Sequence, residues 1–124
     1  MPKILLVEDN DDNWDMLSRR LERRGFEVER AEDGAVAVEK APKGFDLILM
    51  DVNLPVMDGL EATRQIRAAA GATRTPIIAL SAHALTTDED KAIAAGADAY
   101  HTKPVELPRL LEQIEGLLKP AAAP

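Results

Sequence analysis

The sequence predicts an α/β fold in which a doubly wound, five-stranded parallel sheet is covered by five helices. Short apolar runs alternate with longer segments of helical periodicity, which is typical of repeated βα units and a parallel sheet. The run Leu47–Met50 is apolar on both faces, as expected for a central strand of such a sheet. Gly25 and Gly96 follow helical segments, where a left-handed residue commonly ends a helix.

Five strands are expected. The second alternates apolar residues with glutamates, as an edge strand does, whereas the others are mainly apolar. In chain order the expected strands are Lys3–Val7, Glu27–Ala31, Leu47–Met50, Ile77–Leu80 and Ala99–Thr102.

Five helices are expected between and after these strands. In the last helix, leucines and Ile114 recur with the helical period and form one apolar face. Asp58 is expected to cap the third helix, and Gly71 to end it. In chain order the expected helices are Asn13–Arg24, Gly34–Ala41, Leu60–Ala70, Thr87–Ala95 and Glu106–Leu118.

Length and composition indicate one cytoplasmic domain. The 124 residues suffice for a single core, which we place in residues 1–119, with residues 120–124 as a disordered tail. The absence of cysteine excludes disulfides, thiolate zinc sites and cysteine nucleophiles. Neither a membrane span nor a signal peptide is expected, because the apolar runs are short and the N-terminus leads straight into a strand. A net charge of −7 argues against nucleic-acid binding.

Polar side chains follow four of the five expected strands. Glu8 and Asp9 follow the first strand. Asp51 follows the third, Ser81 the fourth and Lys103 the fifth. In parallel α/β sheets, ligands bind outside the carboxyl ends of the strands, at the point where the strand order reverses. We therefore expect these five side chains to converge on one pocket.

Three carboxylates in one pocket require a cation or a proton among them. Two carboxylates about 5 Å apart repel by roughly 3 kcal/mol at an effective dielectric of about 20. Oxygen ligands without histidine or cysteine suit a hard ion, and Mg²⁺ commonly uses one or two carboxylates and retains waters. We expect Asp9 and Asp51 to bind Mg²⁺ directly. The backbone carbonyl of Asn53 is the expected third ligand, and Glu8 is expected to act through water.

The same pocket suits phosphoryl transfer. The Asp51 carboxylate can attack phosphorus and form an acyl phosphate, while Lys103 and the Ser81 hydroxyl hold phosphoryl oxygens. Taken singly, each residue has an ordinary structural explanation, such as helix capping or a solvated surface position. Their joint placement at strand ends favours a functional site. His101, in contrast, is expected to lie on the surface of an edge strand.

Four stretches of the chain resemble the receiver domain of two-component response regulators. The resemblance covers about Lys3–Leu118, and four stretches in this order and at this spacing are very specific. They are Ile4–Asn10, Asp46–Gly59, Pro76–Ala82 and Ala95–Pro104. The resemblance implies a flavodoxin-like fold with the strand order 2-1-3-4-5.

The resemblance also implies a role for each residue of the pocket and a cis peptide bond between Lys103 and Pro104. The implied roles are phosphoacceptor for Asp51, acidic metal pair for Glu8 and Asp9, phosphate contact for Lys103, switch hydroxyl for Ser81 and switch aromatic for Tyr100.

A receiver takes its phosphoryl group from a phosphohistidine of a sensor histidine kinase or a histidine phosphotransfer protein. It catalyses its own phosphorylation and a slow dephosphorylation. Because only a short tail follows the last helix, we expect a single-domain response regulator that signals by phosphorylation-dependent partner binding. The expected docking surface for its target is the face formed by the fourth helix, the fifth strand and the fifth helix.

Other interpretations stay open. A receiver excised from a hybrid histidine kinase would have the same sequence, and a phosphate sink would need no switch. A metal-dependent aspartyl phosphatase usually has a second acid two residues after its nucleophile, where this chain has Asn53. A flavodoxin-like electron carrier would need hydroxyls and amides after the first strand, where this chain is acidic.

Overall fold

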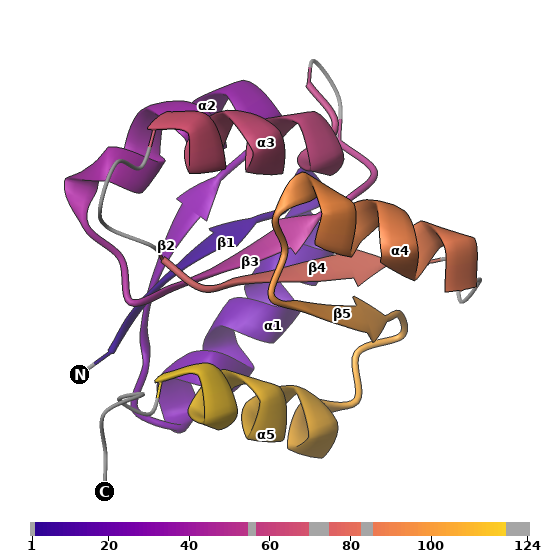
Figure 1. Ribbon diagram of the computed structural model, residues 1–124. Coiled ribbons are helices and arrows are strands. Elements are labelled where there is room, and N and C mark those ends of the chain that lie inside the picture. The colour runs from indigo at the N-terminus through magenta and orange to yellow at the C-terminus, as the bar shows by residue number, and fades with distance from the viewer. Residues whose placement is uncertain (1, 55–56, 70–74, 83–85, 119–124) are drawn as a thin grey trace, which may run out of the picture.

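The computed structural model describes residues 2–54, 57–69, 75–82 and 86–118. Five parallel strands form one sheet in the order β2-β1-β3-β4-β5, with helices on both faces (Figure 1). This confirms the predicted fold class and strand order. The strands are β1 (Lys3–Val7), β2 (Glu27–Ala31), β3 (Leu47–Asp51), β4 (Ile77–Ser81) and β5 (Ala99–Thr102).

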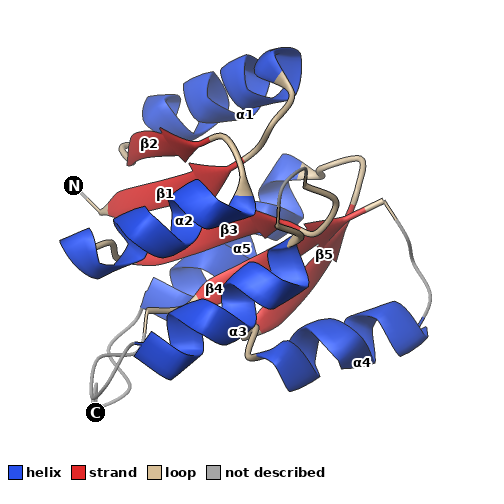
Figure 2. Cartoon of the chain, turned by 90° about the horizontal axis from the view of Figure 1, so that it is seen from above, coloured by secondary structure: helices blue, strands red, loops and turns tan. Residues whose placement is uncertain are grey.

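The helices form a layer on each face of the sheet. In Figure 1, α2 and α3 lie above the sheet, α4 lies above β5 on the same face, and α1 and α5 lie below the sheet. Figure 2 shows the same layers from above. The helices are α1 (Asp11–Arg23), α2 (Gly34–Lys40), α3 (Gly59–Ala69), α4 (Thr86–Ala95) and α5 (Leu107–Leu118), and a 3₁₀ turn, η1 (Ala41–Lys43), follows α2.

Alternating strand residues divide the core into two parts. Leu5 and Val7 of β1 pack with residues of α2, α3 and α4, whereas Ile4 and Leu6 pack with residues of α1 and α5. Every residue of β3 is buried, as expected for a central strand that is covered on both sides. The central strands that carry the candidate site are therefore packed from both sides.

Most element boundaries agree with the sequence to within a residue or two. Helix α1 begins earlier than expected, at Asp11, because the side chain of Asn10 accepts a hydrogen bond from the Asn13 N–H at 2.9 Å and caps the helix. Asp58 caps α3 as predicted, with its Oδ1 2.9 Å from the Glu61 nitrogen. Gly25 and the glycine after α4 adopt positive φ, which confirms their role as helix ends.

Strands β3 and β4 are each one residue longer than predicted. Their last residues are Asp51 and Ser81, and the next backbone bonds continue the ladder: the Val52 N–H donates to the carbonyl of Leu80 at 2.9 Å. Two polar residues of the candidate site are thus fixed by the sheet itself rather than by loops.

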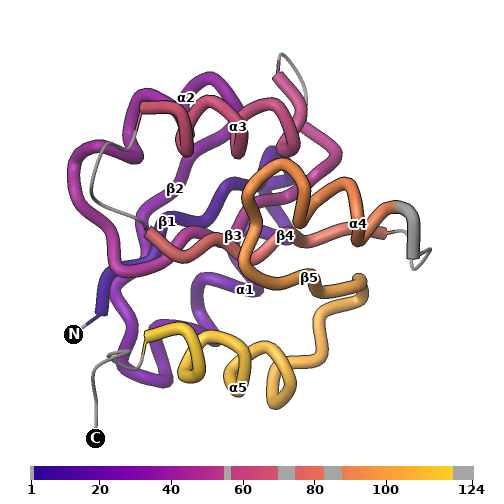
Figure 3. The backbone as a smooth tube through the Cα atoms, viewed as in Figure 1, coloured from indigo at the N-terminus to yellow at the C-terminus, as the bar shows by residue number. Residues whose placement is uncertain are grey.

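The chain reverses its direction of travel across the sheet after β2. Figure 3 shows that it runs from β1 outward to β2 and then returns past β1 to β3. The point of reversal therefore lies between β1 and β3, which pair from Ile4 with Leu47 to Val7 with Met50. Residues that follow β1 and end β3 meet at this point, where α/β sheets bind ligands.

The expectation that His101 is a surface residue is wrong. His101 is only 1% exposed and lies on the α5 side of β5, like Ala99 two residues before it. Its Nδ1 lies 2.8 Å from Gln113 Oε1, and its Nε2 accepts a hydrogen bond from the Glu106 N–H at 3.2 Å. Helix α5 covers this face of β5, so the ring is buried and satisfied.

Two expectations fall outside the structure as described, namely the end of the third helix at Gly71 and the tail from residue 120. In the ranges that are described, no helix combines the length and the apolar character that a bilayer span requires.

Candidate functional site

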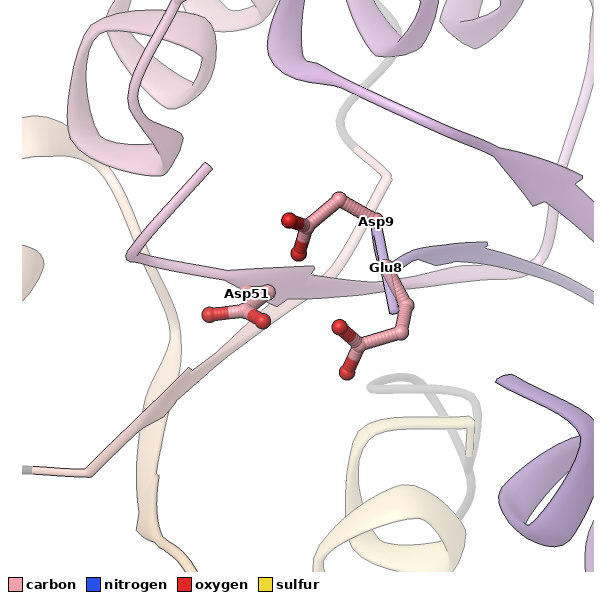
Figure 4. Close-up of side chains that lie close together, drawn as sticks. All are labelled: Glu8, Asp9 and Asp51. Atoms are coloured by element: carbon pink, nitrogen blue, oxygen red, sulfur yellow. The ribbon is translucent and has the colours of Figure 1, made fainter. Parts of the chain in front are cut away.

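Three carboxylates meet where β1 and β3 end. Glu8 and Asp9 directly follow β1, and Asp51 is the last residue of β3. Each offers an oxygen within 4.8 Å of the other two, and Figure 4 shows the Glu8 and Asp9 side chains reaching toward Asp51. Glu8 and Asp51 are buried, whereas Asp9 is exposed. The cluster is therefore open to solvent on the Asp9 side.

Lys103 neutralises part of this charge. Its Nζ lies 2.9 Å from Asp51 Oδ2 and 3.5 Å from Glu8 Oε1. Its backbone N–H donates to the Ser81 carbonyl at 2.7 Å, so the loop after β5 is fastened to the end of β4. The Lys103–Pro104 peptide bond is cis, as the resemblance implies.

Burial and the neighbouring charges shift the pKa values of two members of this cluster. Burial raises the pKa of Glu8, and the nearby Asp51 adds to this effect, although the Asn10 N–H and the charge of Lys103 oppose it. Burial alone would lower the pKa of Lys103, but its hydrogen bond to Asp51 and the charges of Asp51 and Glu8 outweigh burial and raise it. Lys103 is therefore cationic at neutral pH.

Both carboxylate oxygens of Asp51 are held. Oδ1 accepts a hydrogen bond from the Asn53 N–H at 3.0 Å, and Oδ2 accepts one from Lys103. This fixes the carboxylate orientation before any ligand arrives. Asn53 itself is exposed just beyond the strand end, and the hydrogen bond from its N–H to Asp51 places its backbone nitrogen beside the acidic cluster.

Ser81 lies on β4, the strand next to that of Asp51, whereas Tyr100 lies on β5, one strand further away. Ser81 ends β4, is buried, and pairs in register with Thr102. Tyr100 lies on β5 and packs, half-buried, against the core on the α2–α4 side. The structure thus places both where the sequence expected them, and their roles as switch residues stay predictions.

A groove of about 570 Å³ opens beside the cluster between α1 and the connection from β5 to α5. Glu8 and Lys103 line one end of it, Met16 and Val105 supply apolar walls, and Arg20 adds a positive charge. Of the three carboxylates, Glu8 lines this groove, whereas Asp9 and Asp51 do not.

Two residues that were not among the predicted site residues support the site. Gly59 begins α3, and a Cβ built there would lie 2.2 Å from the Asp51 carbonyl oxygen, so no larger residue fits without movement. Arg30 of β2 donates hydrogen bonds to the backbone carbonyls of Glu8 and Asp9 at 3.1 and 3.2 Å. The Asp58-Gly59 dipeptide was a visible turn signal, whereas nothing in the sequence pattern marks Arg30.

The donor set fits a hard divalent cation. The cluster offers only carboxylate oxygens, and the chain has no cysteine. Its two buried acids share a single lysine, so a cation on the open side would add the missing positive charge. The same arrangement leaves Asp51 as a buried carboxylate with a fixed orientation, and its role as a nucleophile stays a prediction.

Comparisons with known proteins agree with this geometry. The protein-family model of the response regulator receiver domain matches residues 4–115. The polar-differentiation response regulator DivK of Brucella anthropi is 37% identical over 95% of this chain and 98% of that protein. The chain also matches histidine kinases of rice and Dictyostelium discoideum, but it spans 13% or less of their length.

Two solved structures are close in both sequence and fold. The first is the receiver domain of sensor histidine kinase PA1611 from Pseudomonas aeruginosa, described with a magnesium ion coordinated in the active site cleft. It is 41% identical with a TM-score of 0.86 and covers 94% of this chain and 97% of that one. The second is the receiver domain of the response regulator Ssk1 of Saccharomyces cerevisiae in complex with the histidine phosphotransfer protein Ypd1. It is 35% identical with a TM-score of 0.85 and covers 91% and 86%.

Proposed function

Because the chain belongs to the response regulator receiver domains, we propose that Asp51 accepts a phosphoryl group from a phosphohistidine and that this changes partner binding. The single observation that carries the proposal is the position of Asp51, a buried carboxylate that is fixed between the acidic pair Glu8 and Asp9 and the cation of Lys103. The donor is a sensor histidine kinase or a histidine phosphotransfer protein, a class that includes the partner of Ssk1.

Mg²⁺ is the proposed cofactor. Asp9, Asp51 and the backbone carbonyl of Asn53 would bind it directly, and Glu8 would act through water. The clustered oxygens support this choice, as does the magnesium ion of the PA1611 receiver. When bound, Mg²⁺ would neutralise negative charge on the carboxylates and on the incoming phosphoryl oxygens.

In the transfer step, a carboxylate oxygen of Asp51 forms a bond to phosphorus while the bond between phosphorus and the donor's imidazole nitrogen breaks. The electron pair of that bond leaves with the imidazole, which takes up a proton from solvent. Lys103 is cationic and already contacts Asp51, so its ammonium group can bind a phosphoryl oxygen once the group is attached to Asp51. The Ser81 hydroxyl would hold another oxygen.

The proposed output uses the face formed by α4, β5 and α5. Phosphoryl oxygens on Asp51 would attract the Ser81 hydroxyl, and Tyr100 on the adjacent strand would then move to a more buried rotamer. Phosphorylation would bias two pre-existing states of this face, and a target would distinguish them. Residues 83–85, which connect Ser81 to α4, lie outside the described residues.

We place this receiver domain in residues 1–119 and in the cytoplasm. The family match over residues 4–115 supports the boundaries, and the cysteine-free, acidic composition fits the compartment. Both stand-alone regulators and longer histidine kinases are among the relatives, so either context is compatible with the sequence.

Incubation with acetyl phosphate, with and without Mg²⁺, tests the proposal by intact mass. The wild type should gain one phosphoryl group only with Mg²⁺, and Asp51→Asn should gain none. Equal labelling of that variant would move the acceptor elsewhere. Sustained hydrolysis of p-nitrophenyl phosphate would instead favour the aspartyl phosphatase.

The switch is tested separately with beryllofluoride, which mimics a phosphoryl group on Asp51. Amide chemical shifts should change in residues 86–118 as well as around the acidic cluster. Changes confined to the cluster would leave a phosphate sink as the better account.

A further inference from the structure

One side chain outside the acidic cluster fastens the backbone that carries two of its carboxylates. The Nε of Arg30 donates to the Glu8 carbonyl at 3.1 Å, and its Nη2 donates to the Asp9 carbonyl at 3.2 Å. Its Nη1 lies 2.9 Å from Asp11 Oδ1, and the guanidinium carbon lies 5.6 Å from the centroid of the Trp14 ring. Arg30 therefore connects β2, the end of β1 and the first turn of α1.

The hydrogen bonds from Arg30 begin where the hydrogen-bond ladder between β1 and β2 ends. The ladder between β1 and β2 ends with Val7 opposite Ala31, and the Glu8 N–H makes one further bond to the Ala31 carbonyl at 3.0 Å. Beyond that bond, the fork of Arg30 supplies partners for the next two carbonyls. The Asp11 side chain is 90% exposed, so its ion pair adds little, and the paired carbonyl bonds are the specific part.

The direction of these contacts is what gives them a function. Arg30 holds the main chain of Glu8 and Asp9 from the β2 side, while their carboxylates point toward Asp51 on the β3 side (Figure 4). A free loop would have to lose conformational freedom when its carboxylates bind a cation. A loop that is already held loses less and binds more tightly.

We propose that Arg30 is a positioning residue that presets the Glu8 and Asp9 carboxylates for a divalent cation. This inference rests on the proposed cation site. Outer-shell partners of metal ligands typically change metal affinity by about 10-fold to 100-fold, and we expect the low end of that range because solvent can replace part of the lost hydrogen bonding.

The positive charge of Arg30 should weaken cation binding, whereas its hydrogen bonds to the two carbonyls should strengthen it. Variants can therefore separate the two effects. A cation near a divalent-ion site repels the ion, so an Arg30 that acted only through charge would weaken binding. Arg30→Gln would then tighten Mg²⁺ binding, and Arg30→Lys would leave it unchanged. A positioning role predicts weaker binding for both, because lysine keeps the charge but cannot form the planar fork.

The experiment is calorimetric titration of MgCl₂ into the full chain, with Trp14 fluorescence as a second readout. Arg30→Gln and Arg30→Lys should both bind Mg²⁺ about 10-fold more weakly than wild type. Arg23→Gln is the matched control, since it removes the same charge from an exposed position on α1 and should bind like wild type. At saturating Mg²⁺, labelling by acetyl phosphate should return to the wild-type rate in both Arg30 variants, which a general loss of structure would not allow.

Thermal melts in chelator show whether each variant is folded. If Arg30→Gln is not folded, the affinity of Arg30→Lys alone decides whether Arg30 has the positioning role. Wild-type affinity in the Lys variant, with or without tighter binding in the Gln variant, would overturn the positioning role. Absence of Mg²⁺ binding by the wild type would overturn the cation site itself, and the inference with it. The two failures are therefore distinguishable.

Discussion

Replacing Lys103 with methionine should destabilise the protein in chelator, and Mg²⁺ should recover most of the loss. The Asp51 and Glu8 side chains are 4% and 5% exposed, and Lys103 is their shared cation at 2.9 and 3.5 Å. Removing one partner of a buried charge pair costs about 3–5 kcal/mol. Lys103 is itself 25% exposed and Glu8 can take up a proton, so we expect about 2–3 kcal/mol.

For a domain of this size, that loss lowers the melting temperature by about 10 °C. The assay is a thermal melt with chelator and with Mg²⁺, for the wild type, Lys103→Met and the exposed control Lys43→Met. The stabilisation by Mg²⁺ should be larger in Lys103→Met than in the wild type, because the ion replaces a missing charge. A melting temperature in chelator close to that of the control, or equal Mg²⁺ shifts in all three proteins, would refute the charge-balance reasoning.

Four further variants, one of them a control, test the structural roles of Glu8, Gly59 and His101. Burial raises the pKa of Glu8 above its ordinary value of 4.5, so the stability that Glu8 contributes is full below pH 4.5 and is lost as the pH rises through its folded pKa. In chelator at pH 7, Glu8→Gln should therefore melt at a higher temperature than the wild type. If the stability of Glu8→Gln varied with pH as that of the wild type does, this explanation would be contradicted. Gly59→Ala should lower the free energy of unfolding in urea by about 1–3 kcal/mol, because its Cβ would clash with the Asp51 carbonyl. Gly116→Ala on α5 has open space around it and should raise the free energy of unfolding by about 0.5–1 kcal/mol. Similar effects at both sites would show that the close approach of Gly59 to Asp51 is unimportant. His101→Ala removes the ring that satisfies two polar groups on or before α5 and should cost about 1–3 kcal/mol in the same assay, while a neutral effect would mean that water replaces the ring.

The sequence predicts the fold well because its signals are local and repeated. Apolar runs of strand length alternate with helical periods, and parallel strands can be connected only by such crossovers. The same geometry explains why Glu8, Asp9, Asp51 and Lys103 could be brought together from sequence. All parallel strands present their carboxyl ends at one edge, so residues that follow them converge without knowledge of any contact.

The errors and omissions have physical causes that no local pattern reveals. His101 is buried because α5 packs on one face of a four-residue strand, and its partner Gln113 lies 12 residues later. Arg30 contacts the site because its side chain reaches from β2 to the end of β1, where Glu8 lies 22 residues earlier in the sequence. Strands β3 and β4 are longer than the sequence predicts, because polar side chains are typical of strand ends, whereas here the backbone bonds continue through Asp51 and Ser81.

The proposed function depends on Asp51 as the residue that carries the phosphoryl group. The most direct measurement is borohydride reduction of the protein after Mg²⁺ and acetyl phosphate treatment, followed by peptide sequencing by mass spectrometry. Reduction converts an aspartyl phosphate into homoserine and so marks the acceptor. Homoserine should appear at position 51 and at no other aspartate. Homoserine at Asp9 or elsewhere, with position 51 unchanged, would contradict it.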